Sequence, residues 1–216
     1  MRTSPKALNI FEWKSQKGLV GYVEALKFME AQVKAIQNNE GSECIWFLEH
    51  PPLYTLGTSA HEEDILRPTK LPLYKTGRGG KITYHGPGQR IVYLLLDLKT
   101  YYQDIRRYVG ELETWIIQVL SYFGVKGERR PDRIGIWVQK EGYDHKIAAL
   151  GIRVQKWVTS HGLALNVSPD LSAYQDIVPC GINQYGVTSL SDLGLSVAME
   201  EVDIILQKTC PFGPCA

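Results

Sequence analysis

Two residues with chemically useful side chains stand in tightly specified local contexts. Lys146 begins the run Lys-Ile-Ala-Ala-Leu-Gly, and Cys180 lies in Pro-Cys-Gly-Ile. A cysteine can hold an acyl group as a thioester, and a lysine that partial burial keeps neutral can take up the thiol proton and pass it on. Pro179 and Gly181 leave the thiol open to close approach by a substrate. Together these residues predict acyl transfer.

A glycine-rich segment, residues 77–89, offers a third chemical feature. The segment matches neither a Walker loop nor a dinucleotide-binding fingerprint. At position 82 the first motif requires Ser or Thr and the second requires glycine, but the chain has Ile82. We expect instead a glycine turn, a short strand and a second turn that line a narrow slot. Arg78 and Lys81 could meet a phosphate or carboxylate there, and His85 could exchange a proton near the reacting atom.

The histidines leave one alternative open. His161 opens a run of small and apolar residues and could border an acyl pocket, or it could act as the base for Cys180 in a Cys/His hydrolase; the spacing does not decide. His50 and His61 stand in loop contexts and are expected at the surface without partners. No two histidines have the spacing of metal ligands, so we predict no metal site.

Composition narrows the class of protein. The 216 residues favour a single domain over 1–216, and 24 Lys and Arg residues nearly balance 23 Asp and Glu residues, which argues against general nucleic-acid or membrane binding. The longest apolar run, residues 91–96, is far below the ~20 residues of a membrane-spanning helix, and the N-terminus has no secretion signal.

Four scattered cysteines fit a reducing, cytoplasmic protein better than a disulfide framework. Cys44 begins an apolar strand-like run and should be buried. Cys210 and Cys215 flank prolines and a glycine at the C-terminus, and we expect them to be tail residues without regular structure.

Hydrophobic periodicity predicts an alternation of helices and strands. Asp104 is expected to cap the most regular helix, and Gly124 to end it. Residues 61–72 are expected to form an exposed loop that leaves the sheet. The pattern favours an α+β domain with a mixed, mainly antiparallel sheet flanked by helices. The expected elements are helices over 19–36, 104–123 and 199–208 and strands over 44–48, 54–56, 134–138, 146–154 and 162–167.

Four blocks taken together resemble one family. Residues 78–89, 146–151, 161–166 and 179–181, in this order and at similar spacing, closely resemble the lipoyl (octanoyl) transferase family, with a family-like core over about 19–208. The resemblance implies the fold of lipoate and biotin protein ligases. It also implies a reaction that consumes no nucleotide and moves an octanoyl group from octanoyl-acyl carrier protein to a lysine of lipoyl domains. Such domains occur in 2-oxoacid dehydrogenase E2 subunits and in the glycine cleavage H protein. We expect the protein to be a monomer without a cofactor.

The resemblance also implies roles for individual residues. Cys180 matches the acyl-thioester nucleophile, Lys146 matches the lysine that lowers the pKa of that thiol and shuttles protons, and His161 is a possible supporting residue. An ATP-dependent lipoate ligase of the same fold, the hydrolase and a non-catalytic docking protein remain as alternatives. The positions that match segments lining the acyl substrate are Arg78, Gly79, Gly80, Lys81, Ile82, Thr83, Tyr84, His85, Ala149, Leu150, Gly151, Gly162, Leu163 and Ala164.

Overall fold

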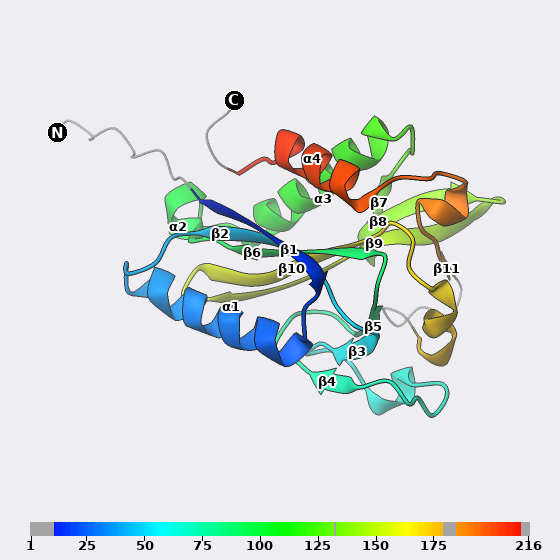
Figure 1. The fold of residues 1–216 in the computed structure, drawn as a ribbon, viewed down its shortest axis with the longest axis horizontal. Coiled ribbons are helices and arrows are strands. Elements are labelled where there is room, and N and C mark those ends of the chain that lie inside the picture. Colours follow the sequence, from blue (N-terminus) through cyan, green and yellow to red (C-terminus); the bar gives the residue numbers. More distant parts are fainter. Residues whose placement is uncertain (1–10, 132, 179–184, 213–216) are drawn as a thin grey trace.

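A large mixed sheet forms the centre of the molecule (Figure 1). The computed structural model describes residues 11–131, 133–178 and 185–212. Within the large sheet the neighbouring strands are antiparallel, except that β1 is parallel to β2 and β11 is parallel to β9. The predicted α+β class with a mainly antiparallel sheet is therefore confirmed. In spatial order the strands are β1 (Glu12–Leu19), β2 (Cys44–Glu49), β6 (Gln89–Leu95), β10 (Val158–Asn166), β9 (Tyr143–Gln155), β8 (Arg133–Lys140) and β7 (Glu128–Arg130), with β11 (Gly186–Val187) beside β9.

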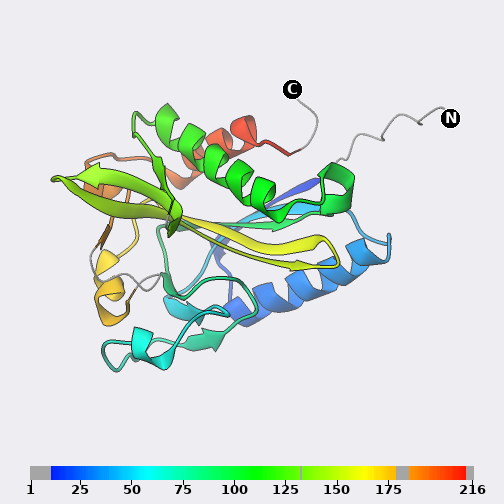
Figure 2. The same cartoon turned by 180° about the vertical axis from the view of Figure 1, so that it is seen from behind.

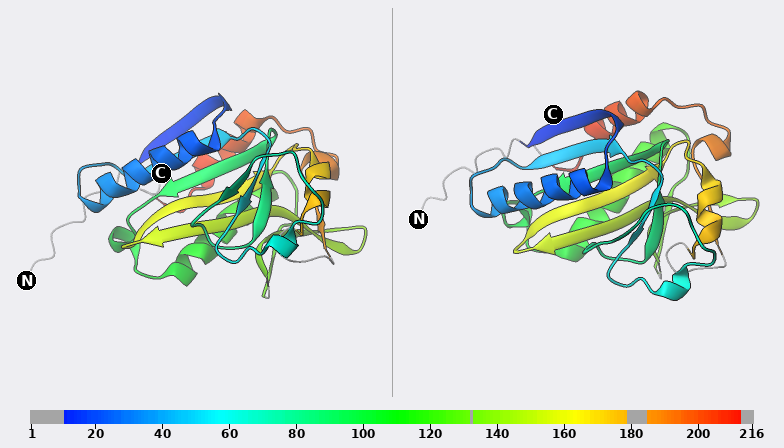
Figure 3. Two further views of the ribbon diagram at one scale, coloured as in Figure 1. Left: turned by 90° about the horizontal axis from the view of Figure 1, so that it is seen from below. Right: turned by 60° about the horizontal axis from the view of Figure 1, so that its bottom comes forward.

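A second, smaller sheet lies next to the large one and close to one end of α1 (Tyr22–Gln37) (Figures 1 and 3). Its central strand β3 (Leu53–Leu56) pairs in parallel with β4 (Leu73–Lys75) and antiparallel with β5 (Ile82–His85). The glycine-rich segment predicted to be turn, strand and turn is thus built as expected, with β5 between its two turns.

One face of the large sheet is covered by α3 (Ile105–Tyr122) and α4 (Met199–Thr209), with the short α2 (Leu98–Tyr101) nearby (Figure 2). The carboxylate of Asp104 accepts a hydrogen bond from the backbone N–H of Arg107, and Gly124 adopts φ +75° just past the helix. Both predicted ends of this helix are confirmed. Its apolar stripe is fully buried against the sheet and α4.

The other face of the sheet is covered by α1, which buries Ala25, Met29 and Val33 against it. The predicted helix over 19–36 is correct except at its start, because Leu19 ends β1 and is half exposed. Strand β1 itself was not predicted. It is an edge strand with mostly exposed side chains, so its sequence carries no clear alternation of apolar and polar residues.

Most other predicted elements are present within a few residues, and two expectations need correction. Residues 61–72 are not a purely exposed loop, because Asp64 is buried and Ile65 forms a bridge with Ile177. Cys210 is not an unattached tail residue, since it follows α4 directly and packs against the same core as the buried Phe212. Cys44 is buried as predicted, and Cys215 lies outside the described residues. No helix in the described ranges is both long and apolar enough to cross a membrane.

Candidate active site

A narrow apolar cavity lies on the α1 face of the large sheet. Strands β9, β10 and β6 form its floor, β5 forms its opposite wall, and Tyr22 at the start of α1 reaches into it. Its volume is about 50 Å³, so it suits a thin, unbranched ligand. The lining consists of Tyr22, Arg78, Gly80, Lys81, Thr83, His85, Ile91, Tyr93, Ala149, Leu150, Gly151, His161, Gly162, Leu163 and Ala164.

A wider groove of about 560 Å³ adjoins this cavity. Both are lined by Gly80, Lys81, Leu150 and Gly151, so they meet at that point. The groove also contains Lys146 and is flanked by apolar side chains of α3 and β8. The structure therefore brings together most of the residues predicted to bind substrate and places the predicted catalytic lysine at the neighbouring groove.

Lys146 is held inside the protein, with only 6 % of its surface exposed. Its Nζ donates a hydrogen bond to the carbonyl oxygen of Ile134 at 3.1 Å and lies 4.7 Å from the centroid of the Trp137 ring. The Trp137 ring and the Ile134 carbonyl thus stabilise the amine, and neither contact is with a carboxylate. The Lys146 side chain is therefore held in place, and it forms no salt bridge with any described residue.

The segment that follows Cys180 in the sequence returns to this lysine. Strand β11 runs parallel to β9, and Val187 pairs with Lys146. The ring of Tyr185 lies 5.7 Å from the ring of Trp137. Cys180 itself, with residues 179–184, lies outside the described residues. The predicted relation between Cys180 and Lys146 therefore stays a prediction.

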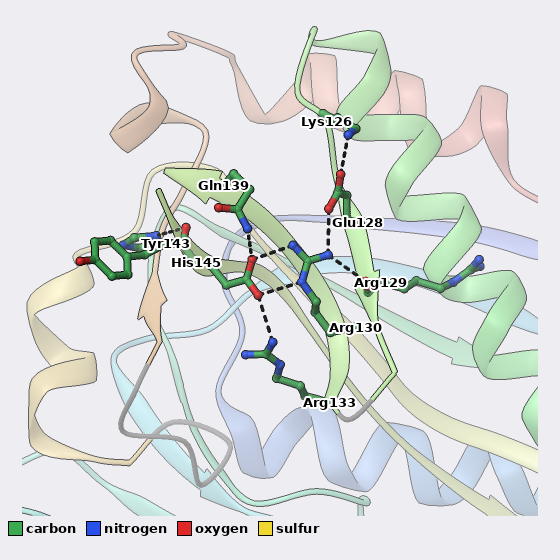
Figure 4. Close-up of polar contacts among 9 residues, drawn as sticks. Lys126, Glu128, Arg129, Arg130, Arg133, Gln139, Tyr143 and His145 are labelled. Atoms are coloured by element: carbon green, nitrogen blue, oxygen red, sulfur yellow. Dashed lines mark hydrogen bonds and ion pairs between the residues drawn. The ribbon is translucent and has the colours of Figure 1, made fainter. Parts of the chain in front are cut away.

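A cluster of charged side chains links strands β7, β8 and β9 next to the groove. Figure 4 shows the side chains of Arg130, Arg133 and Gln139 pointing toward one carboxylate, that of Asp144, to which all three donate hydrogen bonds. The hydrogen bonds from Arg130 are the main cause that lowers the pKa of Asp144. The Arg133 guanidinium also stacks 3.6 Å from the centroid of the Tyr185 ring. The cluster thus ties β7, β8 and β9 together and holds Tyr185 beside them.

Arg78 anchors the glycine turn from inside the protein. Its buried guanidinium donates hydrogen bonds to the carbonyl oxygens of Thr55 at 2.7 Å and Lys81 at 2.9 Å, and to Gly79. These bonds fix the glycine turn to β3. Arg78 also lines the inner cavity, and its predicted contact with a phosphate or carboxylate stays a prediction. Lys81 is one-third exposed and pairs with Asp64 at 3.5 Å.

The predicted substrate segment 78–85 does not line the cavity along its whole length. Because side chains alternate along a strand, Thr83 and His85 face the cavity. Ile82 and Tyr84 pack instead in a separate cluster with Tyr54. Ile82 and Tyr84 therefore do not line the inner cavity, and their predicted contact with the acyl substrate stays a prediction. Gly79 lines the outer groove.

Three buried histidines surround the inner cavity. His50, predicted at the surface, is fully buried: its Nδ1–H donates to the carbonyl oxygen of Val20 at 2.7 Å, and its Nε2 accepts from the hydroxyl of Tyr93 at 2.8 Å. Burial lowers the pKa of His50 to about 4, lowers the pKa of His161 to about 3, and holds the pKa of His85 well below its usual range. All three rings are thus neutral at neutral pH.

His161 adopts φ +59° within β10, an uncommon conformation for a residue with a side chain. Its Nε2 lies 3.4 Å from the hydroxyl of Tyr22, and its ring packs edge-on against Tyr93. As a neutral, strongly desolvated ring it is a poor proton acceptor at neutral pH, which weighs against the hydrolase alternative.

Sequence reasoning missed three residues that line the cavity: Tyr22, Ile91 and Tyr93. Their sequence positions indicate only that they belong to the apolar side of a helix or strand. Tyr22 and His161 are far apart in the chain, and only the assembled fold brings them together. No local signal in the sequence distinguishes these three residues from ordinary core residues.

Comparison with known proteins agrees with this geometry. Residues 21–210 match the model of the lipoyl protein ligase A/B catalytic domain. The chain belongs to this family. It is 54 % identical over 214 residues to an octanoyltransferase of Brucella melitensis, with 94 % of this chain and 81 % of the relative covered. It is 52 % identical to an octanoyltransferase of Bartonella quintana, with 94 % of this chain and 87 % of the relative covered. The family and these relatives identify the chain as an acyltransferase.

Solved structures with low sequence identity share the fold. A lipoate-protein ligase A bound with ATP superimposes with a TM-score of 0.68 at 16 % identity, covering 92 % of this chain and 84 % of that one. A bipartite lipoate protein ligase from Thermoplasma acidophilum gives a TM-score of 0.67 at 15 % identity, covering 93 % of this chain and 82 % of that one. The predicted fold is thereby confirmed.

Proposed function

We propose that the protein moves an octanoyl group from octanoyl-acyl carrier protein, through a thioester on Cys180, to a lysine of a lipoyl domain. The acceptors would be the lipoyl domains of 2-oxoacid dehydrogenase E2 subunits and the glycine cleavage H protein. The observation that carries the proposal is the buried Lys146 in a groove that continues into a narrow apolar cavity. The octanoyl group itself is taken from the names of the relatives.

In the first half-reaction, the thiolate of Cys180 attacks the carbonyl carbon of the donor thioester. A bond forms between Sγ and this carbon, the bond to the carrier sulfur breaks, and the carrier thiolate leaves with a proton from Lys146. Lys146 gained that proton when it activated the thiol. The acyl chain lies in the inner cavity, whose apolar lining excludes water from the thioester.

In the second half-reaction, the acceptor lysine amine attacks the thioester carbon. A carbon–nitrogen bond forms, the bond to Sγ breaks, and Lys146 takes the proton that the amine loses. One thioester is exchanged for another in the first step, and the amide formed in the second is more stable. The reaction therefore needs no ATP, and it needs only one copy of the chain. A free cysteine nucleophile fits a reducing cytoplasm.

Two observations weigh against the other candidates. An ATP-dependent ligase of this fold needs no nucleophilic cysteine, so the sequence Pro179-Cys180-Gly181 argues against it. For a Cys/His hydrolase, His161 would have to act as the base, yet burial lowers its pKa to about 3. Both alternatives make distinct predictions in a transfer assay.

The test is octanoyl transfer from octanoyl-acyl carrier protein, with free octanoate as the alternative donor, to a purified lipoyl domain, followed by intact-protein mass spectrometry with and without ATP. We expect transfer without ATP by the wild-type protein and none by Cys180→Ser. Transfer from free octanoate with ATP, and none from octanoyl-acyl carrier protein, would support the ligase, and release of free octanoate without transfer would support the hydrolase. Lys126→Ala serves as the matched control, since the Lys126 side chain is 89 % exposed.

A further inference from the structure

The floor of the inner cavity changes from small to large side chains across the sheet. Two rows of paired residues cross from β9 through β10 to β6. One row is Ala149, Ala164 and Ile91, and the other is Gly151, Gly162 and Tyr93. In each row the residues on β9 and β10 are small and leave space above the sheet, and the large side chain on β6 closes that space. The next strand, β2, contributes no residue to the lining.

The blocking side chains are fixed in place. Ile91 is 1 % exposed and Tyr93 is 4 % exposed. The Tyr93 hydroxyl donates to His50, which is itself anchored on the carbonyl oxygen of Val20. Because both ring nitrogens of His50 are used, Tyr93 cannot swing aside without breaking a buried hydrogen bond. The cavity therefore has a rigid end.

We propose that Ile91 and Tyr93 set the maximum length of the acyl chain that the enzyme accepts, an inference that rests on the proposed function. Entry lies at β9, where the cavity meets the groove of Lys146, and the end lies at β6. Adjacent strands are about 4.8 Å apart, so the open floor extends for roughly 10 Å. This matches the reach of an extended eight-carbon chain, and a longer chain would collide with Ile91.

The test compares acyl-carrier-protein donors with chains of six, eight, ten and twelve carbons. We expect Ile91→Ala to raise kcat/KM for the ten-carbon donor relative to the eight-carbon donor by about tenfold or more, since a pocket distinguishes single methylene groups by this amount. Leu95→Ala is the matched control. Leu95 lies on the same strand and the same face, is fully buried, and does not line the cavity.

The converse variant fills the open floor. Ala164 pairs directly with Ile91, so Ala164→Leu should shift the preference to six-carbon donors and reduce eight-carbon transfer about tenfold or more. Ala164→Leu enlarges a side chain, whereas Ile91→Ala shortens one. Opposite shifts in the preferred chain length therefore cannot both come from a general loss of packing. Circular dichroism and urea unfolding establish that each variant is folded.

The outcomes separate this proposal from the proposed function. If the wild-type protein transfers the eight-carbon chain best and Ile91→Ala and Ala164→Leu keep that same preference, the length-setting role is wrong while the function stands. If Leu95→Ala shifts the preference as much as Ile91→Ala, the effect belongs to the core and the role is again wrong. If the wild-type protein transfers no chain of any length, the proposed function fails first.

Discussion

The two faces of the large sheet are built differently. The face under α3 and α4 is filled by a large apolar cluster around Trp115. The face under α1 and the small sheet contains Ala149, Gly151, Gly162 and Ala164, which leave a cavity, and buries three histidines around it. Dense packing on the first face stabilises the sheet, and this stability allows the second face to keep open space and buried polar groups, both of which cost free energy.

The largest effect on activity is expected on the cavity side. Replacement of Lys146 by Ala should lower kcat/KM for acyl transfer by about 10²–10⁴, because a general acid and base is lost. Lys146→Arg should be nearly as inactive, since a guanidinium does not give up its proton. The measurement is steady-state transfer to a lipoyl domain, with Lys126→Ala as control. Near wild-type activity in Lys146→Ala would remove this residue from the mechanism.

The largest effect on stability is expected on the helix side. Trp115 is fully buried, and its indole N–H donates to the carbonyl oxygen of Leu206 at 3.0 Å. Trp115→Ala should lower the free energy of unfolding by about 3–5 kcal/mol, measured by urea denaturation. The folded fraction should retain its chain-length preference. A changed preference would show that the two faces are not independent.

How far the sequence predicts this fold depends on where the contacts lie. Local signals were sufficient for α3, because a capping aspartate, a regular apolar stripe and a terminal glycine all lie within one segment. They failed for β1, whose exposed residues carry no alternation and whose strand character comes from parallel pairing with β2. That pairing joins residues about thirty positions apart.

The same limit applies to the site. Motif blocks predicted the residues of β9 and β10 that form the floor, because each block is a continuous piece of chain. The loop context of His50 misplaced this residue at the surface, because its two partners, Val20 and Tyr93, are distant in the sequence. The motif blocks also grouped Ile82 and Tyr84 with Thr83 and His85, because a motif does not tell which side of a strand faces the cavity.

The pH dependence of the free energy of unfolding should come partly from the cavity face, where histidines are buried. A histidine whose pKa falls to about 4 on folding binds fewer protons than in the unfolded chain, so its contribution to stability is complete above about pH 6.5 and is lost as the pH falls. For His50 the loss between about pH 7 and pH 4 is about 3 kcal/mol. His50→Gln should remove that part of the pH dependence.

The measurement is urea denaturation at several pH values between these limits. His61→Gln is the control, because His61 is exposed and lies away from the cavity lining. An unchanged pH dependence in His50→Gln would contradict the assignment of His50 as a buried, neutral histidine.

The smallest expected effect lies at the start of α3. Asp104→Ala removes the side chain that accepts from the Arg107 N–H at 3.0 Å and should lower the free energy of unfolding by about 1 kcal/mol. Asp104→Ser, which keeps a capping oxygen, should lose much less. Transfer activity should be unchanged in both variants. A loss in Asp104→Ser equal to that in Asp104→Ala would show that capping is not the cause.

The most direct test of the account is to isolate the acyl-enzyme and chase it. Wild-type protein is mixed with octanoyl-acyl carrier protein without ATP, separated from the donor, and digested so that mass spectrometry can assign the octanoyl group to one residue. We predict the group on Cys180 and its complete transfer when a lipoyl domain is added, with slow transfer from Lys146→Ala. An octanoyl group absent from Cys180, or present but not transferred to the lipoyl domain, would contradict the account.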